Sequence, residues 1–283
     1  MIRLRARSLP APAVLAAALL ALAASPPSPA AAQRDDAEWL ERCREQRGSR
    51  WGQDRARFCE VRTERLRPTG SLVVDGGENG GASVRGWDGN EIRVSARIQT
   101  HAPTEAEARE LARQIRVSTS GGNIRATGPE RRRGAGWTVV YEIRVPRRQD
   151  VSVTTQNGPV AVEDVRGRMT LRAANGPVSL RRVGGAVNAR VRNGPLSVVL
   201  DGDRWNGEGL DAETVNGPVR LTLPADYSAQ LEVGTVNGPA NIDLPLSEGY
   251  RSGRHIRTTL GSGGAPVRVV TTNGPVAVRR GES

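Results

Sequence analysis

Few residues of this sequence have the types and spacing that enzyme chemistry requires. Its 283 residues include two histidines, His101 and His255, and all 41 basic side chains are arginine. Neither histidine belongs to a Ser-His-Asp or histidine–metal arrangement, and there is no Gly-x-Ser-x-Gly elbow and no Gly-Lys phosphate-binding loop. We therefore predict that the protein is not an enzyme, and we assign it no catalytic residue, no metal ligand and no cofactor.

One acidic cluster keeps an enzymatic alternative open. Enzymes that cleave polysaccharides on stacked β-coils take their paired carboxylates from neighbouring coils. The sequence has no such column of carboxylates, but one loop surrounds Trp205 with Asp201, Asp203, Glu208 and Asp211. We interpret this loop as a solvated bulge. The alternative is a sugar or cation site, and with it a carbohydrate-active enzyme.

Four arginines suggest a second alternative. Arg172 and Arg190 each lie three residues before a repeated asparagine, so they are predicted to share one face, which Arg181 and Arg182 would extend. The simpler interpretation is that these are solvent-facing strand positions. The alternative is a face that binds an anionic envelope polymer through charge and bidentate hydrogen bonds.

The overall charge does not identify a partner by itself. The 41 basic and 30 acidic side chains give a net charge of +11, which is spread along the chain without a concentrated block. Aromatic residues are scarce, with 5 Trp, 3 Tyr and 1 Phe, so the stacking platforms of single-strand nucleic-acid binders are missing. We expect no nucleic acid as partner, and an envelope protein or an anionic envelope polysaccharide instead.

The clearest pattern is a repeated turn. Asn-Gly-Pro occurs six times after residue 150, and the asparagines are separated by 18, 18, 23, 21 and 36 residues, the last step being twice 18. Alternating apolar residues flank each turn, as Met169 and Leu171 precede one and Val178 and Leu180 follow it. The period predicts an all-β, β-helix-like parallel β-solenoid over 151–283. An antiparallel sandwich or barrel is the alternative, because Asn-Gly also favours hairpins.

The chemistry of the turn explains its composition. Glycine takes positive φ without steric cost, asparagine tolerates the left-handed region, and proline enters a strand only where no amide donor is needed. Asparagines in phase can also bond to one another along a column. The predicted structural turn residues are Asn157, Gly158, Asn175, Gly176, Asn193, Gly194, Asn216, Gly217, Asn237, Gly238, Asn273 and Gly274.

Less regular elements precede the repeat. Residues 69–150 are predicted to hold several strands and one short helix near 104–115, which begins with a capping box of Thr104 and Glu107. The expected strands are 71–74, 82–85, 91–98, 115–119, 124–126 and 137–145. Residues 33–68 indicate a small, charged, helical N-terminal cap, with one helix near 36–46 and then a second turn or helix. A disulfide between Cys43 and Cys59 is expected to close it.

Residues 1–32 have the pattern of a signal peptide. Arg3 begins a cationic segment, residues 11–24 are almost wholly apolar but too short to span a membrane, and residues 30–32 supply small side chains for cleavage. We expect an exported protein of the periplasm, the cell envelope or the outside of the cell, without a transmembrane segment after processing.

Several motifs resemble a bacterial putative-adhesin family of unknown function. They are the strand entry at 86–92, the helix at 104–114, the Asn-Gly repeats, and the loops at 201–207 and 258–264. The resemblance spans residues 70–280 and implies a secreted, β-helix-like protein with β-strand repeats and no established catalytic residues. It implies a non-catalytic, adhesin-like binding or scaffold protein.

Overall fold

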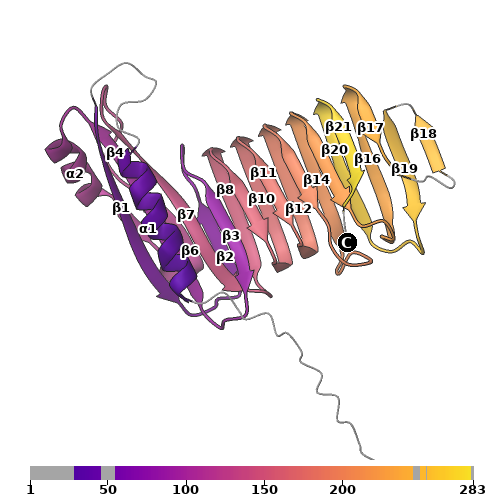
Figure 1. Ribbon diagram of the computed structural model, residues 1–283, viewed down its shortest axis with the longest axis horizontal. Helices are drawn as coiled ribbons and strands as arrows, with labels where there is room; N and C mark the ends of the chain where they lie inside the picture. The colour runs from indigo at the N-terminus through magenta and orange to yellow at the C-terminus, as the bar shows by residue number, and fades with distance from the viewer. Residues whose placement is uncertain (1–28, 46–54, 245–248, 253, 282–283) are drawn as a thin grey trace, which may run out of the picture.

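The computed structural model describes residues 29–45, 55–244, 249–252 and 254–281. In this part of the chain two α-helices and one 3-10 turn accompany strands that form two large, mostly parallel sheets. Within each sheet the strands follow one another along the long axis of the molecule (Figure 1). Residues 1–28 of the predicted signal peptide lie outside the described residues. Neither described α-helix is long and apolar enough to cross a membrane.

The elements before the repeat closely follow the predicted strands from residue 71 onward. They are α1 (Pro29–Glu45), β1 (Ala56–Leu66), β2 (Ser71–Asp75), β3 (Ala82–Trp87), β4 (Ile92–Ala102), α2 (Glu105–Gln114), β5 (Arg116–Ser118), η1 (Ser120–Gly122), β6 (Asn123–Thr127) and β7 (Gly136–Pro146). The repeat contains β8 (Asp150–Asn157), β9 (Val160–Glu163), β10 (Arg166–Asn175), β11 (Val178–Arg181), β12 (Gly184–Asn193), β13 (Leu196–Val199), β14 (Gly209–Asn216), β15 (Val219–Leu223), β16 (Ala229–Asn237), β17 (Ala240–Ile242), β18 (Gly249–Ser252), β19 (His255–Leu260), β20 (Pro266–Asn273) and β21 (Val276–Arg280).

Each repeat unit forms a coil that places one strand in each sheet. In sheet 1 the strand order is β1-β4-β7-β3-β9-β11-β13-β15-β21-β17, and in sheet 2 it is β18-β19-β16-β20-β14-β12-β10-β8-β2-β6-β5. Neighbouring coils pair in parallel, as β10 does with β12 and β11 with β13. The parallel register rules out the antiparallel alternative for the repeat.

The asparagines of the turns form a ladder between coils. Asn175 Nδ2 donates to Asn157 Oδ1 at 2.8 Å, and Asn193 Nδ2 donates to Asn175 Oδ1 at the same distance. The ladder continues through Asn216 to later coils. In-phase stacking of the turns is thus a property of the structure.

Glycine is required at these turns chiefly because the coils approach closely. A Cβ atom built on Gly176 would lie 2.3 Å from the carbonyl oxygen of Gly158, and one on Gly194 would lie 2.1 Å from that of Gly176. Gly176 has the expected positive φ, at 146°. The expectation that the turn asparagines use the left-handed region is wrong, because none of them has a positive φ. Among the described residues, the non-glycine positions with positive φ are Asp164 and Arg182.

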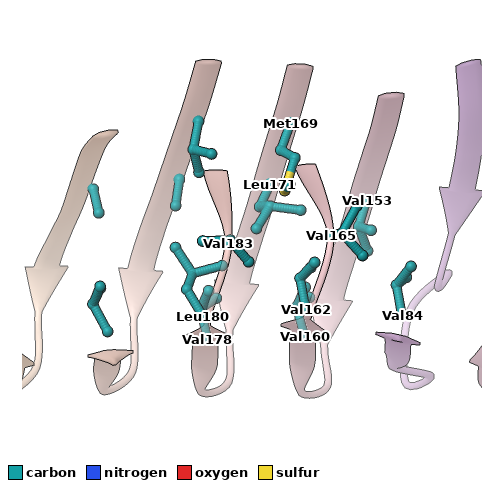
Figure 2. Packing of buried hydrophobic residues seen from close by; sticks show 14 of the residues in the cluster. Val84, Val153, Val160, Val162, Val165, Met169, Leu171, Val178, Leu180 and Val183 are labelled. Atoms are coloured by element: carbon teal, nitrogen blue, oxygen red, sulfur yellow. The ribbon is translucent and has the colours of Figure 1, made fainter. Parts of the chain in front are cut away.

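The core between the sheets is narrow and aliphatic. Figure 2 shows Val160 and Val162 of one coil and Val178 and Leu180 of the next at equivalent places between the sheets, and all four side chains are buried. Packed sheets lie about 10 Å apart, which leaves room for small and medium side chains from each face. Val, Leu, Ile and Ala fill most of this space.

The order of the coils in space differs from their order in the chain. β20 pairs in parallel with both β14 and β16, so the last coil lies between the two coils that precede it in the sequence. The residues before β20 contribute a hairpin, β18–β19, that runs antiparallel to β16. The step of 36 residues, which is twice 18, therefore does not correspond to two coils stacked in sequence.

The N-terminal segment differs from the predicted helical cap. Its second element is strand β1, which pairs antiparallel with β4 and so belongs to sheet 1. The structure joins Cys43 of α1 and Cys59 of β1 in the expected disulfide. Asp36 of α1 accepts hydrogen bonds from Ser95 Oγ at 2.7 Å and from Arg97 Nε at 2.9 Å, both on β4. α1 is therefore docked on the outer face of sheet 1.

Helix α2 has defined signals at both ends. Its first turn carries the predicted capping box, in which the Glu107 amide donates to Thr104 Oγ1 at 3.2 Å and the Thr104 amide donates to Glu107 Oε2 at 3.1 Å. At the other end, Arg62 of β1 donates to the backbone oxygens of Ile115 at 2.6 Å and Ala112 at 2.9 Å. These bonds attach the C-terminal end of α2 to β1, the edge strand of sheet 1.

Candidate functional site

The four arginines of the predicted polyanion face do not share one face. Arg172 and Arg190 are direct neighbours on β10 and β12 of sheet 2, as their spacing predicted. Arg181 lies on β11 of sheet 1, and Arg182 occupies the corner after it with φ at 50°. The predicted extension of the basic area by Arg181 and Arg182 is therefore wrong, because these two residues lie in sheet 1 and at the corner that follows it.

Carboxylates accompany most of these arginines. Arg182 donates to Asp164 at 2.7 Å and to Glu163 at 2.5 Å, and Arg181 lies 3.6 Å from Glu163. Its hydrogen bond to Asp164 raises the pKa of Arg182, and the same bond lowers the pKa of Asp164. Arg190 pairs with the Asp211 carboxylate. Within the described residues no ion pair involves Arg172.

The acidic loop does not gather its carboxylates into one site. Trp205 is buried and donates its indole N–H to the backbone oxygen of Gly185 at 2.9 Å, so it anchors the loop to a neighbouring coil. Asp203 pairs with Arg204, whereas Asp211 lies on β14 and pairs with other arginines. In the part of the chain that the structure describes, no group of three His, Cys, Asp or Glu could hold a metal ion.

A groove on the outer face of sheet 2 is the main candidate site. It has a volume of about 1000 Å³ and crosses β10, β12, β14, β20, β16 and β19, neighbours in the sheet (Figure 1). We call it the sheet 2 groove. Its polar and charged lining consists of Arg168, Thr170, Asn188, Glu208, Asp211, Gln230, Glu232, Arg257, Thr258, Thr259 and Arg268.

One row of directly opposed residues forms the floor of the groove. Strand pairing aligns them across the sheet in the order Thr170, Asn188, Asp211, Arg268, Glu232 and Arg257. Adjacent strands are about 4.8 Å apart, so these side chains form a regular line along the long axis of the molecule. The row begins with a hydroxyl and an amide and continues with alternating charges.

Ion pairs hold the charged part of the row. Arg268 lies 2.8 Å from the Asp211 carboxylate and 3.4 Å from that of Glu232, and Glu232 also contacts Arg257 at 3.1 Å and His255 at 3.2 Å. His255 thus has a carboxylate partner that its sequence neighbours did not reveal. The alternation of signs makes this part of the groove nearly neutral overall.

The carboxylates of the row are held in their charged form. Burial alone would raise the pKa of Asp211, but hydrogen bonds from Arg190 and Arg268 outweigh it and keep the pKa below its ordinary value. Glu232 behaves in the same way, since its hydrogen bond from Arg257 and the nearby positive charges outweigh burial and lower its pKa. Such groups are suited to hold and orient a ligand, whereas a general acid needs a raised pKa.

The sequence contains a signal for this row that the three-residue spacing overlooked. Thr170, Asn188, Asp211, Glu232 and Arg268 each lie five residues before a repeated asparagine. That phase identifies five of the six members of the row, whereas Arg257 on β19 lies outside the repeat phase. The phase does not give their order in space, because the coil that carries Arg268 is inserted between the coils that carry Asp211 and Glu232.

Three solved structures that resemble this chain share little sequence with it. One is described as a putative cell adhesion protein from Clostridium sporogenes, with 8% identity and a TM-score of 0.45, covering 79% of this chain and 100% of that one. A putative adhesin from Bacteroides fragilis has 10% identity and a TM-score of 0.27, covering 79% and 97%. A putative lipid binding protein from Parabacteroides distasonis has 10% identity and a TM-score of 0.26, with the same coverage.

No curated protein matches the sequence. The family model Toastrack DUF4097 matches residues 92–279, which is most of the chain and includes every repeated turn. This match agrees with the family resemblance inferred from the Asn-Gly repeats. The chain belongs to the Toastrack DUF4097 family.

Proposed function

We propose that this protein is a non-catalytic, adhesin-like binding or scaffold protein that holds an extended polar polymer in the sheet 2 groove. The observation that carries the proposal is the aligned row on the groove floor, which presents hydrogen-bonding groups at a constant spacing over six neighbouring strands. Stacked repeats commonly use such extended surfaces for binding.

The charge of the groove favours a neutral polymer over a polyanion. Its ionisable lining comprises Arg168, Arg257 and Arg268 against Glu208, Asp211 and Glu232, so the two signs balance. A polyanion would have to compete with the carboxylates that already pair with Arg257 and Arg268. A neutral polysaccharide, with hydroxyls that both donate and accept, matches the Thr170 and Asn188 end of the row.

The proposed setting is the cell envelope. The sequence pattern of residues 1–32 supports export as a signal peptide, and the disulfide between Cys43 and Cys59 suits an oxidising compartment. We retain the division into a signal peptide (1–32), an N-terminal segment (33–68), an irregular β segment (69–150) and a parallel β-solenoid (151–283) as part of this proposal.

A binding assay on immobilised neutral and anionic polysaccharides tests the proposal. The wild-type chain is compared with a Thr170→Ala, Asn188→Ala double variant, and we expect retention on at least one neutral polysaccharide. Loss of two hydrogen-bonding groups, at about 0.5–1.5 kcal/mol each, should weaken that binding about tenfold.

A matched control lies on the opposite sheet. Ser179 and Ser197 are direct neighbours on β11 and β13 with half-buried outer-face positions, so Ser179→Ala, Ser197→Ala removes two polar groups away from the groove. This variant should bind as the wild type does. Retention by anionic polymers alone, or equal binding of both double variants, would refute the assignment to the groove.

A further inference from the structure

The first coil departs from the asparagine ladder at one position. The turn glycines of successive coils, such as Gly158, Gly176 and Gly194, form a glycine column. Gly80 belongs to it, because a Cβ on Gly158 would lie 2.1 Å from the Gly80 carbonyl oxygen. Asn79 therefore stands where the ladder would place its next asparagine. Yet Asn157 Nδ2 donates to the backbone oxygen of Glu78 at 2.7 Å, and not to the side chain of Asn79. The asparagine ladder therefore ends at the backbone oxygen of Glu78, and the Asn79 side chain takes no part in it.

The Asn79 side chain instead forms hydrogen bonds with Arg131. In the amide orientation that satisfies both groups, Asn79 Oδ1 accepts from the two terminal nitrogens of Arg131 at 2.5 and 2.8 Å. Arg131 also donates to the backbone oxygen of Trp137 at 3.0 Å and lies 3.8 Å from the Glu78 carboxylate. These contacts join the turn of the first coil to the connection between β6 and β7.

A cavity of about 390 Å³ lies between that turn and that connection, within the size range of small-molecule sites. We call it the Asn79 pocket. One wall is residues 75–80, and the other includes the half-buried ring of Trp137. The Trp137 indole N–H donates to the Pro129 oxygen at 2.9 Å, and a Cβ at Gly128 would lie 2.9 Å from the ring. The ring is therefore fixed in place without a ligand.

The lining of the pocket selects among ligand classes. It has three carboxylates, from Asp75, Glu78 and Glu130, against the single guanidinium of Arg131, so phosphate and other anions are disfavoured. Apolar side chains other than Trp137 are few, which disfavours an acyl chain. A fixed aromatic surface beside an amide, carboxylates and a guanidinium suits a molecule with one apolar face and several hydroxyls.

We propose that the Asn79 pocket binds a small neutral saccharide, with the sugar ring against Trp137 and its hydroxyls bonded to Asn79 and the neighbouring carboxylates. This site is separate from the sheet 2 groove and does not depend on it, since the two share no lining residue. It would let the N-terminal end of the molecule engage a sugar unit independently of a polymer held along sheet 2.

The test uses the full chain and four probes: the methyl pyranosides of glucose, galactose, mannose and N-acetylglucosamine. Binding is measured by chemical-shift titration in NMR, with saturation transfer to the sugar protons. At least one probe should bind with a Kd below about 10 mM, as expected for a single sugar unit with few contacts. Asn79→Ala and Trp137→Phe should each weaken this binding at least fivefold while thermal unfolding shows a folded protein.

Two controls separate this site from other effects. Asn193→Ala removes the same residue type at the same position of a later coil, where the amide serves the ladder, and should leave sugar binding unchanged. The Thr170→Ala, Asn188→Ala groove variant should likewise bind the probes normally, so failure of the groove proposal would be visible separately. Absence of binding by all four probes, or wild-type affinity in both pocket variants, would overturn the proposal.

Discussion

Asn273 donates a hydrogen bond of 2.8 Å to Asn216, 57 residues earlier in the chain, although Asn237 lies between them in sequence. Asn237 in turn donates to Asn273 at 2.8 Å. The C-terminal coil is thus inserted into the stack, and it is covered by a neighbouring coil on each side. In a stack built in chain order it would instead follow the coil of Asn237.

The inserted coil leads to a test by deletion. A chain that ends at Ala265 lacks β20 and β21, which leaves β14 and β16 without their shared partner, and we expect loss of cooperative unfolding in circular dichroism. Deletion of 229–260 instead removes the outer coil and the hairpin, so the remaining coils should keep a cooperative transition. Cooperative unfolding of the chain that ends at Ala265, together with loss of cooperative unfolding in the chain that lacks 229–260, would show that the coils stack in chain order.

The glycine column should tolerate no side chain. Gly176→Ala places a methyl group 2.3 Å from a backbone oxygen at a φ of 146°, and we expect about 3 kcal/mol of destabilisation from overpacking and backbone strain together. Urea unfolding measures the change. Gly70→Ala is the matched control, since nothing lies within 4 Å of its added Cβ, and it should stay within about 0.5 kcal/mol of the wild type. Equal effects at the two positions would argue against contact between the coils.

Tyr141 carries a buried hydroxyl with no hydrogen-bond partner among the described residues. Burial, with a contribution from the charge of Asp75, raises the pKa of this phenol. Removing an unsatisfied buried group relieves a desolvation cost, so Tyr141→Phe should leave stability unchanged or raise it by about 1 kcal/mol.

A paired hydroxyl provides the contrast for Tyr141. Thr100 Oγ1 donates to the backbone oxygen of Ala108 at 2.7 Å, and Thr100→Val should cost about 1 kcal/mol or more. Thermal unfolding of both variants measures the difference. A clear loss of stability in Tyr141→Phe would mean that its hydroxyl has a partner.

The ion pairs of the sheet 2 groove should make stability depend on acid. The folded-state pKa values of Asp211 and Glu232 are lowered, so their contribution is present above the unfolded values, near pH 4, and is lost as pH falls through the folded values. We expect Asp211→Asn to lower the melting temperature at pH 7 and to flatten its fall below pH 4. Asp226→Asn, at an exposed position, serves as control and should follow the wild-type curve.

Much of the local structure was predictable because it depends on short-range chemistry. The alternation of Val, Leu and Ala around each turn located the strands of the repeat, and Thr104 with Glu107 located the start of α2. The phase of the asparagines identified the ladder. The predicted second turn or helix of the N-terminal segment is wrong, because pairing of β1 with β4 overrides the weak local preference of these residues.

The tertiary structure alone decided which coils are neighbours. The coils of the Asn-Gly-Pro repeat share the same turn tripeptide and similar apolar strand residues, so the pairing energy scarcely distinguishes one order of these coils from another. The order then depends on how the connections leave each coil, as in the β18–β19 hairpin that folds back on β16. For the same reason, the repeat phase contains five residues of the groove row but does not give their alternation of charge, and the sequence does not reveal that the Asn79 side chain bonds to Arg131 and not to Asn157.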